Sequence, residues 1–386
     1  MLPVKEMIRR NNCFLLLVMP FLFLLGSCGQ GGKPYQASSM MTFDLAACED
    51  TVSGTCVEFD SLTAPVGLEC VDSFVVVLGQ RKEALFTVMN ARTDSLVAQF
   101  GRIGHARDEL LDAPDMCQFV EKTDGSVLMC VQDYGASIIK VFDFTKSLQQ
   151  QRLCYERRVK YDVDFAKVVY YRAFLLQTDG YLIHEGISTD GDARDDFDVP
   201  PCVSVMTRDG VQKISAHTSV IDSGDQDFVD RMYSMLPRMK PDMTKLVEVC
   251  AYVNLFTIVD WAAGSTLGVQ GAGAYGFDDC ERMAKVESAD ELYNHIFVQN
   301  VAFNVTDNYI LVCQDGQTPV SDYARYSSYT PHVRIFDWGG QLLTSFCIRE
   351  SLMRIAYNEE TRMLYGLDAQ GNLYRYDLSK YVENNE

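Results

Sequence analysis

Five carboxylates lie within one short polar segment of this 386-residue chain, between residues 189 and 198. They are Asp190, Asp192, Asp195, Asp196 and Asp198. Oxygen ligands at this density can hold Ca²⁺, which binds through carboxylate, carbonyl and water oxygens. However, Arg194 stands where an EF-hand-type loop needs its third acidic or amide ligand, and no closing Glu follows. The segment therefore predicts a calcium-binding loop or a solvated loop between strands, and we favour the solvated loop.

A second candidate site is a loop rich in Ser and Tyr at residues 321–330. It carries Tyr323, Tyr326 and Tyr329. Exposed aromatic rings can stack on sugar rings or hold a peptide. The alternative is that the long loop packs against neighbouring strands, and both interpretations stay open. The three tyrosines are accordingly candidate binding residues for a glycan or a protein.

Other catalytic motifs are scarce, which favours a protein that is not an enzyme. The five histidines show none of the H-x-H, H-x-x-H or H-E-x-x-H spacings of metal sites, and no G-x-S-x-G elbow is present. Residues 271–276 match G-x-G-x-x-G, but no helix of a βαβ unit is expected after them. The alternative function is a Ca²⁺-dependent, lactonase-like hydrolase. Candidate ligands for its central cation are Asn254, Asn300 and Asp315. Convergence of three or four carboxylates and amides at one end of a channel would favour it.

The first 27 residues have the pattern of an export signal. Lys5, Arg9 and Arg10 precede an apolar run at residues 13–25, which is too short to span a bilayer. Leu25-Gly26-Ser27-Cys28 resembles the bacterial lipobox, which implies that Cys28 is the lipidated first residue of the mature chain. Several acyl chains on one residue provide stable membrane attachment. A polar, Gly-rich tether is expected at residues 28–40.

The overall composition is that of a folded, acidic protein. The formal charge is −19 and hydrophobic residues make up 47% of the chain. This excludes intrinsic disorder, and it argues against nucleic acid as a partner because phosphates require a basic surface. The thirteen cysteines include no C-x-x-C pair, so most are expected as small buried hydrophobic residues. Cys48 and Cys56 are a candidate local disulfide.

Hydrophobic residues beyond residue 40 alternate with period two, which predicts short β-strands. Examples are residues 74–78, 127–131, 203–206 and 309–313, each rich in Val, Ile, Phe or Tyr. The one competing helical pattern lies at residues 227–239. Regularly spaced short strands indicate a sandwich, a barrel or a propeller.

A repeated unit decides among these folds. A strand that ends in an apolar pair and one polar residue recurs six times. The six polar residues are Asn90, Asp143, Thr207, Asp260, Asp337 and Asp377. Each is expected to accept hydrogen bonds from the amides of the following turn. Six copies predict an all-β, six-bladed β-propeller over residues 41–386, with a strand from residues 41–45 completing the last sheet.

The segment from Phe100 to Pro114 resembles the G-R-x-G-x-G-P-x-E-F-x-x-P element of TolB-like or NHL-like six-bladed propeller lipoproteins of Bacteroides-type bacteria. The chain departs from that element at Ala106, Arg107 and Leu110. The resemblance implies a cell-envelope lipoprotein, attached to the outer membrane by its lipid, on the periplasmic or the surface side. It implies no particular activity, because propellers carry many unrelated functions. We therefore expect a non-enzymatic binding or scaffolding module for a protein or glycan.

Overall fold

The computed structural model describes residues 33–45, 50–58, 64–80, 82, 84–161, 168–176, 180–187, 199–221, 226–285, 291, 294–316, 318–319 and 329–382. Pro34–Glu386 form one compact unit. The predicted export signal and Cys28 lie outside the described residues, as do Asp190, Asp192, Asp195, Asp196 and Asp198 of the candidate calcium loop.

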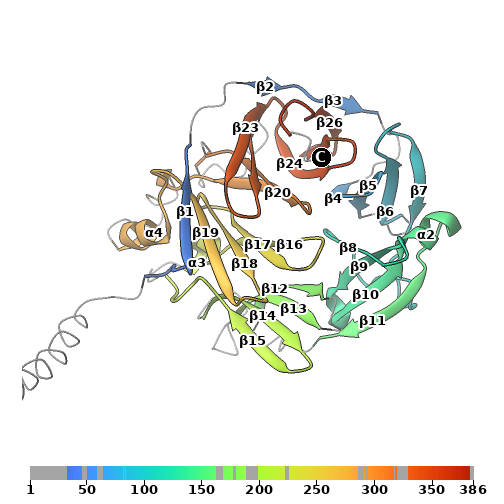
Figure 1. The fold of residues 1–386 in the computed structure, drawn as a ribbon, viewed down its shortest axis with the longest axis horizontal. Coiled ribbons are helices and arrows are strands. Elements are labelled where there is room, and N and C mark those ends of the chain that lie inside the picture. Colours follow the sequence, from blue (N-terminus) through green and yellow to red (C-terminus); the bar gives the residue numbers. More distant parts are fainter. Residues whose placement is uncertain are drawn as a thin grey trace, which may run out of the picture. The chain divides into compact units, whose positions relative to one another are not determined.

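Six sheets surround a central axis (Figure 1), and the consecutive strands within each blade are antiparallel. Blade 1 contains β4 (Pro65–Val71), β5 (Phe74–Gly79), β6 (Phe86–Asn90) and β7 (Leu96–Phe100). Blade 2 contains β8 (Gln118–Glu121), β9 (Val127–Asp133), β10 (Ile138–Asp143) and β11 (Tyr155–Lys160). Blade 3 contains β12 (Val168–Leu175), β13 (Tyr181–Ile187), β14 (Val199–Thr207) and β15 (Gly210–Ile214). The first strand of each blade lies nearest the axis.

The other three blades each take in a strand from the N-terminal region. Blade 4 contains β16 (Met235–Met239), β17 (Lys245–Cys250), β18 (Leu255–Asp260), β19 (Ser265–Gly271) and β1 (Ser39–Phe43). Blade 5 contains β20 (Asn300–Val305), β21 (Tyr309–Gln314), β22 (His332–Asp337), β23 (Leu342–Ile348) and β2 (Thr51–Val52). Blade 6 contains β24 (Leu352–Asn358), β25 (Met363–Asp368), β26 (Leu373–Asp377) and β3 (Thr55–Val57). The predicted all-β, six-bladed propeller is confirmed.

The ring is closed by a different strand from the one predicted. β3 pairs antiparallel with β26, with Cys56 opposite Tyr374, and supplies the fourth strand of blade 6. The segment expected in that position forms β1 instead, which runs parallel to β19 at the outer edge of blade 4. The prediction of residues 41–45 as the closing strand was wrong. Alternating apolar residues predict a strand but not its partner, and the chain passes three blade edges before it enters blade 1.

The six polar residues of the repeat all lie at the last position of the third strand of a blade. Their side chains accept hydrogen bonds from turn amides as predicted: Asn90 from Arg92 (2.9 Å) and Asp143 from Lys146 (2.8 Å). Asp337 accepts from Gly339 and Gln341, both at 2.9 Å. The repeat therefore marks the end of the third strand in each blade by a side chain that accepts from an amide two to four residues further on.

The helical pattern at residues 227–239 is only partly realised. Helix α3 (Gln226–Met232) ends there, and Met235–Met239 form β16, the inner strand of blade 4. Pro237 lies within β16, and an edge strand accommodates a proline because one side of its backbone has no partner strand. The helix prediction was therefore wrong for the last seven residues, 233–239. Within the described ranges, no helix has the length and apolarity needed to cross a membrane.

Residues 34–40, expected as part of the tether, pack on the propeller. The amide of Gln36 donates to the carbonyl of Ala216 (2.6 Å), and the hydroxyls of Tyr35 and Thr257 share a hydrogen bond (2.9 Å). The Tyr35 ring lies against His217, with 5.1 Å between ring centroids. The packed body therefore begins at Pro34 and not at residue 41.

The core consists of apolar layers between neighbouring blades. One layer joins Val76 and Val88 of blade 1 to Met129 and Phe142 of blade 2, all of them fully buried. Both faces of each blade are thus covered, which explains the nearly continuous apolar runs in the middle strands. Two more short helices lie outside the blades, α2 (Phe144–Gln150) after β10 and α4 (Phe277–Ala284) after β19.

Candidate functional site

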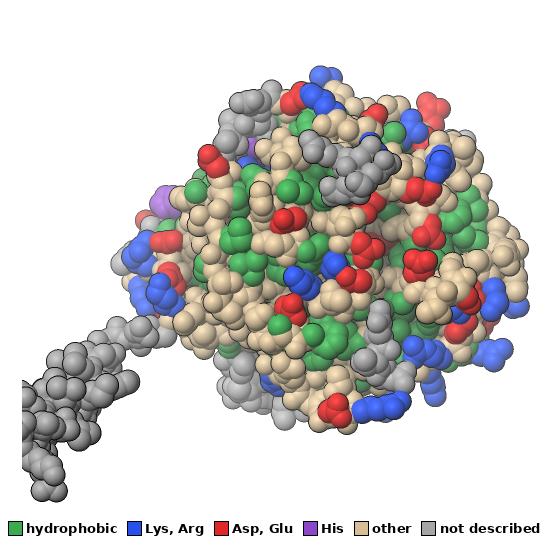
Figure 2. Space-filling view, viewed as in Figure 1, with side chains coloured by type: hydrophobic (Ala, Val, Ile, Leu, Met, Phe, Trp, Pro, Cys, Tyr) green, Lys and Arg blue, Asp and Glu red, His purple; other side chains and the backbone are tan. Residues whose placement is uncertain are grey.

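A cavity of about 300 Å³ lies where the inner strands of the blades end. We call it the acidic mouth, because six of its lining residues are carboxylates: Glu69, Asp72, Glu121, Asp307, Glu359 and Glu360. They come from blades 1, 2, 5 and 6. Figure 2 shows acidic side chains among hydrophobic ones around the centre of one face of the ring. A cavity of this size is within the range of small-ligand sites.

One arginine at the bottom of the acidic mouth is already neutralised. Arg238 donates from Nη1 to both carboxylate oxygens of Glu69, at 2.7 Å each, and its guanidinium lies 5.6 Å from the centre of the Phe303 ring. Both side chains of this ion pair are largely buried. Burial raises the pKa of Glu69, while the Arg238 charge acts in the opposite direction. Because Arg238 is paired with Glu69, it does not compensate the charges of the other carboxylates that line the acidic mouth.

The remaining carboxylates differ in how many hydrogen bonds and ion pairs they make with the rest of the protein. Glu360 pairs with Arg92, and Glu359 accepts hydrogen bonds from the amide (3.1 Å) and Nδ2 (2.9 Å) of Asn308. By contrast, the side-chain carboxylates of Asp72 and Glu121 make no hydrogen bond or ion pair within the described part of the chain. These two carboxylates face the open cavity.

Burial and mutual repulsion raise the pKa of two of these acids. For Asp72 the causes are burial, followed by the charges of Glu121 and Glu360. For Asp307 they are burial, followed by the charges of Asp242 and Glu359. Shifts of this kind concentrate at functional sites, because they reflect charges held together without a partner.

Two buried amides join neighbouring blades at the acidic mouth. Asn304 of β20 accepts from the backbone N–H of Tyr357 on β24 (3.0 Å), and Asn358 of β24 donates to the carbonyl of Asp72 (2.6 Å). Asn304 is only 4% exposed and Asn358 only 2%. The inner strands of blades 5, 6 and 1 are thereby held in register where they meet the cavity.

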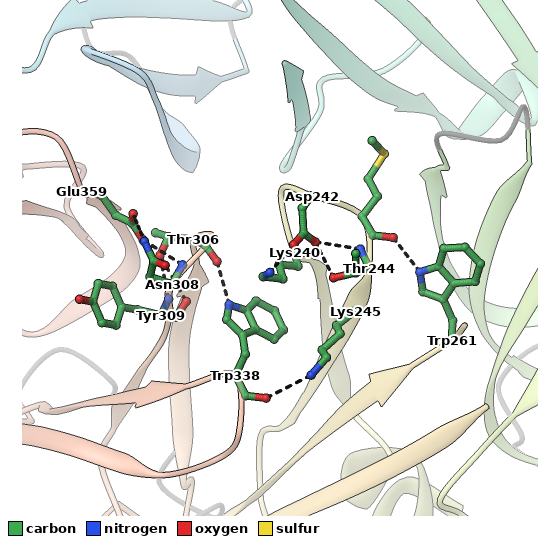
Figure 3. A network of polar contacts seen from close by, with 11 residues as sticks. Lys240, Asp242, Thr244, Lys245, Trp261, Thr306, Asn308, Tyr309, Trp338 and Glu359 are labelled. Carbon is green, nitrogen blue, oxygen red and sulfur yellow. Dashed lines mark hydrogen bonds and ion pairs between the residues drawn. The ribbon is translucent and has the colours of Figure 1, made fainter. Parts of the chain in front are cut away.

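A polar network fixes the turns on one side of the cavity (Figure 3). The indole N–H of Trp338 donates to the carbonyl of Thr306 (3.0 Å), and the ammonium of Lys240 lies 5.6 Å from the Trp338 ring centre. Lys240 also pairs with Asp242, whose other oxygen accepts from the Thr244 amide (2.9 Å). Lys240 therefore makes its ion pair within its own turn, and its charge partly offsets the repulsion at Asp307 on the cavity wall.

Apolar side chains form the rest of the cavity wall. They are Val71, Phe119, Val127, Phe174 and Met239, from blades 1 to 4. No group of three or more His, Cys, Asp or Glu among the described residues has the spacing to hold a metal ion. The carboxylates and amides do converge at one end of the channel, as the hydrolase alternative requires, but their spacing is too wide for a shared metal ion.

The structure describes one of the three candidate tyrosines. Tyr329 is 7% exposed, and its hydroxyl donates to the carbonyl of Leu352. Its amide also donates to the hydroxyl of Ser351 (3.0 Å). Tyr329 thus packs between blades 5 and 6 and is not a surface platform for stacking. Tyr323 and Tyr326 lie outside the described residues.

The amides proposed as central ligands belong to a buried network between blades 4 and 5. Asn300 donates to the carbonyls of Cys250 (2.6 Å) and Val253 (3.2 Å). Gln314 donates to Asn254 (3.0 Å) and to Asn300 (2.8 Å). Asn300 starts β20, so this network lies at the opposite end of the inner strands from the acidic mouth. Its amide oxygens are used within the protein.

The glycine motif at residues 271–276 precedes a short helix, which is not part of a βαβ unit. Gly276 is the N-cap of α4, and its amide donates to the Asp279 carboxylate (2.9 Å). However, α4 links blades 4 and 5 of an antiparallel fold, and its first turn carries Asp278 and Asp279. Two acids at a helix N-terminus disfavour a phosphate there.

The sequence analysis missed the acidic mouth entirely. Its members Asp72 and Glu359 follow directly after the first strand of a blade, and Asp307 lies two residues after the end of β20. The third-strand repeat does not locate these positions, because the first strand of a blade ends 19 to 32 residues before the third strand does. Residues that follow the first strands meet at one end of the ring, however far apart they lie in sequence.

Comparison with known proteins found no matching family model and no matching curated protein. Solved structures match at low similarity. The β-propeller domain of Myceliophteria thermophila Cps50 (Swd1) is 11% identical, over 82% of this chain and 97% of that chain, with a TM-score of 0.38. The RRP9 WD40 repeats are 8% identical, over 84% and 97%, with a TM-score of 0.41. Kuenenia stuttgartiensis hydrazine synthase is 15% identical, over 80% and 74%, with a TM-score of 0.37.

Proposed function

We propose that this protein is a lipid-anchored binding module of the bacterial cell envelope, and that its ligand enters the acidic mouth. The observation that carries the binding function is a cavity of about 300 Å³ lined by six carboxylates and one arginine. The arginine is neutralised by Glu69, so the cavity presents a polar, negatively charged surface. A rigid ring that holds such a cavity is suited to non-enzymatic recognition of a partner.

The envelope location rests on the lipobox-like sequence before Cys28 and on the resemblance of residues 100–114 to TolB-like and NHL-like lipoproteins. Lipid attachment would hold an acidic protein at a membrane that its own charge does not favour. Metabolic labelling with palmitate tests this: the wild-type chain should be labelled and recovered with membranes. The Cys28→Ala variant should lose the label, and retention of the label would contradict lipidation at Cys28.

Capture of envelope components tests the binding function. The purified full chain in detergent should retain at least one component that a mouth variant, Asp72→Asn with Glu121→Gln, does not retain. Both carboxylates are exposed and have no partner within the described residues, so the variant should keep its fold. Asp209→Asn, in the turn between β14 and β15, is the matched control at a distance from the cavity. Equal capture by both variants and the wild type would contradict binding at the acidic mouth.

The hydrolase is the second candidate, because carboxylates and amides converge at one end of the channel. A metal enzyme of this kind requires that Ca²⁺ binds the native state, and such binding raises the melting temperature. We expect equal melting temperatures in Ca²⁺ and in EDTA. A rise of several degrees in Ca²⁺ that the mouth variant abolishes would favour the hydrolase instead.

A further inference from the structure

We infer that the ligand of the acidic mouth is a lysine or arginine side chain of a partner polypeptide, bound together with a neighbouring amide carbonyl of that polypeptide. This inference rests on the proposed function and names the chemistry of the ligand. It combines three independent features of the cavity: unpaired carboxylates, a cavity-facing amide donor with no acceptor in the described part of the chain, and an apolar wall.

The net negative charge of the cavity favours binding of a cation. Its single arginine is committed to Glu69, Glu360 to Arg92, and Glu359 to Asn308. Asp72 and Glu121 retain their charges without a partner in the described part of the chain. Repulsion between these groups contributes to the raised pKa of Asp72. A bound ammonium or guanidinium would relieve that repulsion and make charge-assisted hydrogen bonds.

Asn304 provides the second observation. Its Oδ1 accepts from the Tyr357 amide at 3.0 Å, which fixes the orientation of the side chain and turns Nδ2 away from that amide. Within the described residues Nδ2 has no acceptor, although the residue is 96% buried and lines the cavity. The Nδ2 atom is open to the cavity, where it can donate a hydrogen bond to a ligand. A ligand that places a carbonyl oxygen there would satisfy it, whereas a bare cation would not.

The apolar wall suits the aliphatic part of the same ligand. Phe119, Val127, Phe174 and Met239 line the cavity alongside the carboxylates. Lysine and arginine carry a charged end on an aliphatic stem, and the stem packs on apolar surface while the charge meets polar groups. A polypeptide side chain also brings the amide carbonyl that Asn304 requires.

The first experiment measures binding of acetyl-Gly-Lys-Gly-amide to the purified full chain by calorimetry. The matched probe carries norleucine in place of lysine and so lacks only the charge. We expect the lysine peptide to bind and the norleucine peptide to bind at least tenfold more weakly. The Asp72→Asn, Glu121→Gln variant should lose about tenfold in affinity for the lysine peptide, in keeping with loss of charge-assisted hydrogen bonds. Asp209→Asn should bind as the wild type does.

The second experiment separates the amide donor from the carboxylates. Asn304→Asp keeps an oxygen to accept the Tyr357 amide, removes the Nδ2 donor and adds a negative charge. The probe for the cation alone is 1,5-diaminopentane, which has the lysine stem and charge but no carbonyl. We expect Asn304→Asp to bind this diamine at least as tightly as the wild type. The ratio of peptide affinity to diamine affinity should fall about fivefold.

Three outcomes would overturn the inference: equal binding of the norleucine and lysine peptides, unchanged affinity in the Asp72→Asn, Glu121→Gln variant, or Ca²⁺ binding in place of either organic cation. An unchanged ratio in Asn304→Asp would overturn the part that concerns the carbonyl. These failures differ from failure of the proposed function. If the envelope component depends on the mouth carboxylates but lysine peptide does not displace it, binding at the mouth stands and the lysine or arginine ligand is rejected.

Discussion

Charged residues line a cavity at each of the two ends of the inner strands, but the two cavities use their charges in different ways. Where these strands end, the acidic mouth holds about 300 Å³ and leaves carboxylates without partners. Toward their starts lies a second cavity of about 60 Å³, lined by Arg172, Arg238, Arg354 and Asp115. There the charges are satisfied within the protein. Arg172 forms two hydrogen bonds with Asp115 (3.0 and 2.6 Å), and Arg354 donates to the carbonyls of Val66 (3.0 Å) and Met353 (2.8 Å).

The pKa shifts follow the same division. Burial acts to raise the pKa of Asp115, but the hydrogen bonds and charge of Arg172 outweigh it and the net pKa is lowered. At the acidic mouth the pKa of Asp72 is raised. A lowered carboxylate pKa stabilises the native state at neutral pH, whereas a raised one destabilises it. The charges of the second cavity therefore stabilise the fold. The raised pKa of Asp72 at the acidic mouth lowers the stability of the native state, and perturbed pKa values of this kind are typical of functional sites.

The ion pair between the two cavities should give the largest effect on stability. Arg238 lines both cavities, and Arg238→Met would leave the Glu69 carboxylate buried without its partner. We expect a loss of about 3–5 kcal/mol in the free energy of unfolding, measured by urea denaturation. The double variant Glu69→Gln, Arg238→Met is the control and should recover a large part of this loss, because no charge is then buried. A single-variant loss below about 1 kcal/mol would show that solvent reaches Glu69.

The pair in the second cavity should give a smaller effect with a defined pH dependence. Asp115→Asn removes the carboxylate that Arg172 binds, and we expect a loss of about 1–2 kcal/mol at pH 7, since the pair is partly screened by solvent. The folded-state pKa of Asp115 is lowered, so its contribution is present above the unfolded pKa and disappears as pH falls through the folded pKa. Urea denaturation from pH 7 to pH 3 should therefore show the gap between variant and wild type closing. A gap that stays constant would contradict a charged pair.

The sequence predicted the ring well because the repeat is local. Asp143, Asp337 and the other acceptors bond to amides within four residues, so one local pattern reports the end of the third strand in all six blades. What it could not predict depends on contacts between distant segments. Met235–Met239 form a strand through pairing with β17, which the helical pattern of their own sequence does not show. The pairing of β3 with β26 could not be predicted from local sequence, because the two strands lie more than 300 residues apart. The acidic mouth was not predicted for the same reason. Its residues come singly from the ends of first strands in separate blades.

The Asp72 carboxylate should give the smallest effect, of opposite sign to that of Asp115. At pH 7, Asp72→Asn removes a charge that burial and the neighbours Glu121 and Glu360 disfavour, so we expect the free energy of unfolding to rise by up to about 1 kcal/mol. Asp72 has a positive φ of 46°, and asparagine tolerates that backbone conformation. As pH falls through the raised folded-state pKa, the wild type takes up a proton and the advantage of the variant should vanish.

The matched control for this variant is Asp209→Asn, which removes an exposed carboxylate far from the cavity and should leave both the stability and its pH dependence unchanged. Urea denaturation of the three proteins at pH 7 and pH 4 makes the comparison. A loss of stability in Asp72→Asn at pH 7 would mean that this carboxylate has a stabilising partner. The acidic mouth would then be satisfied internally like the second cavity, and the contrast between the two ends of the channel would no longer single out a binding site.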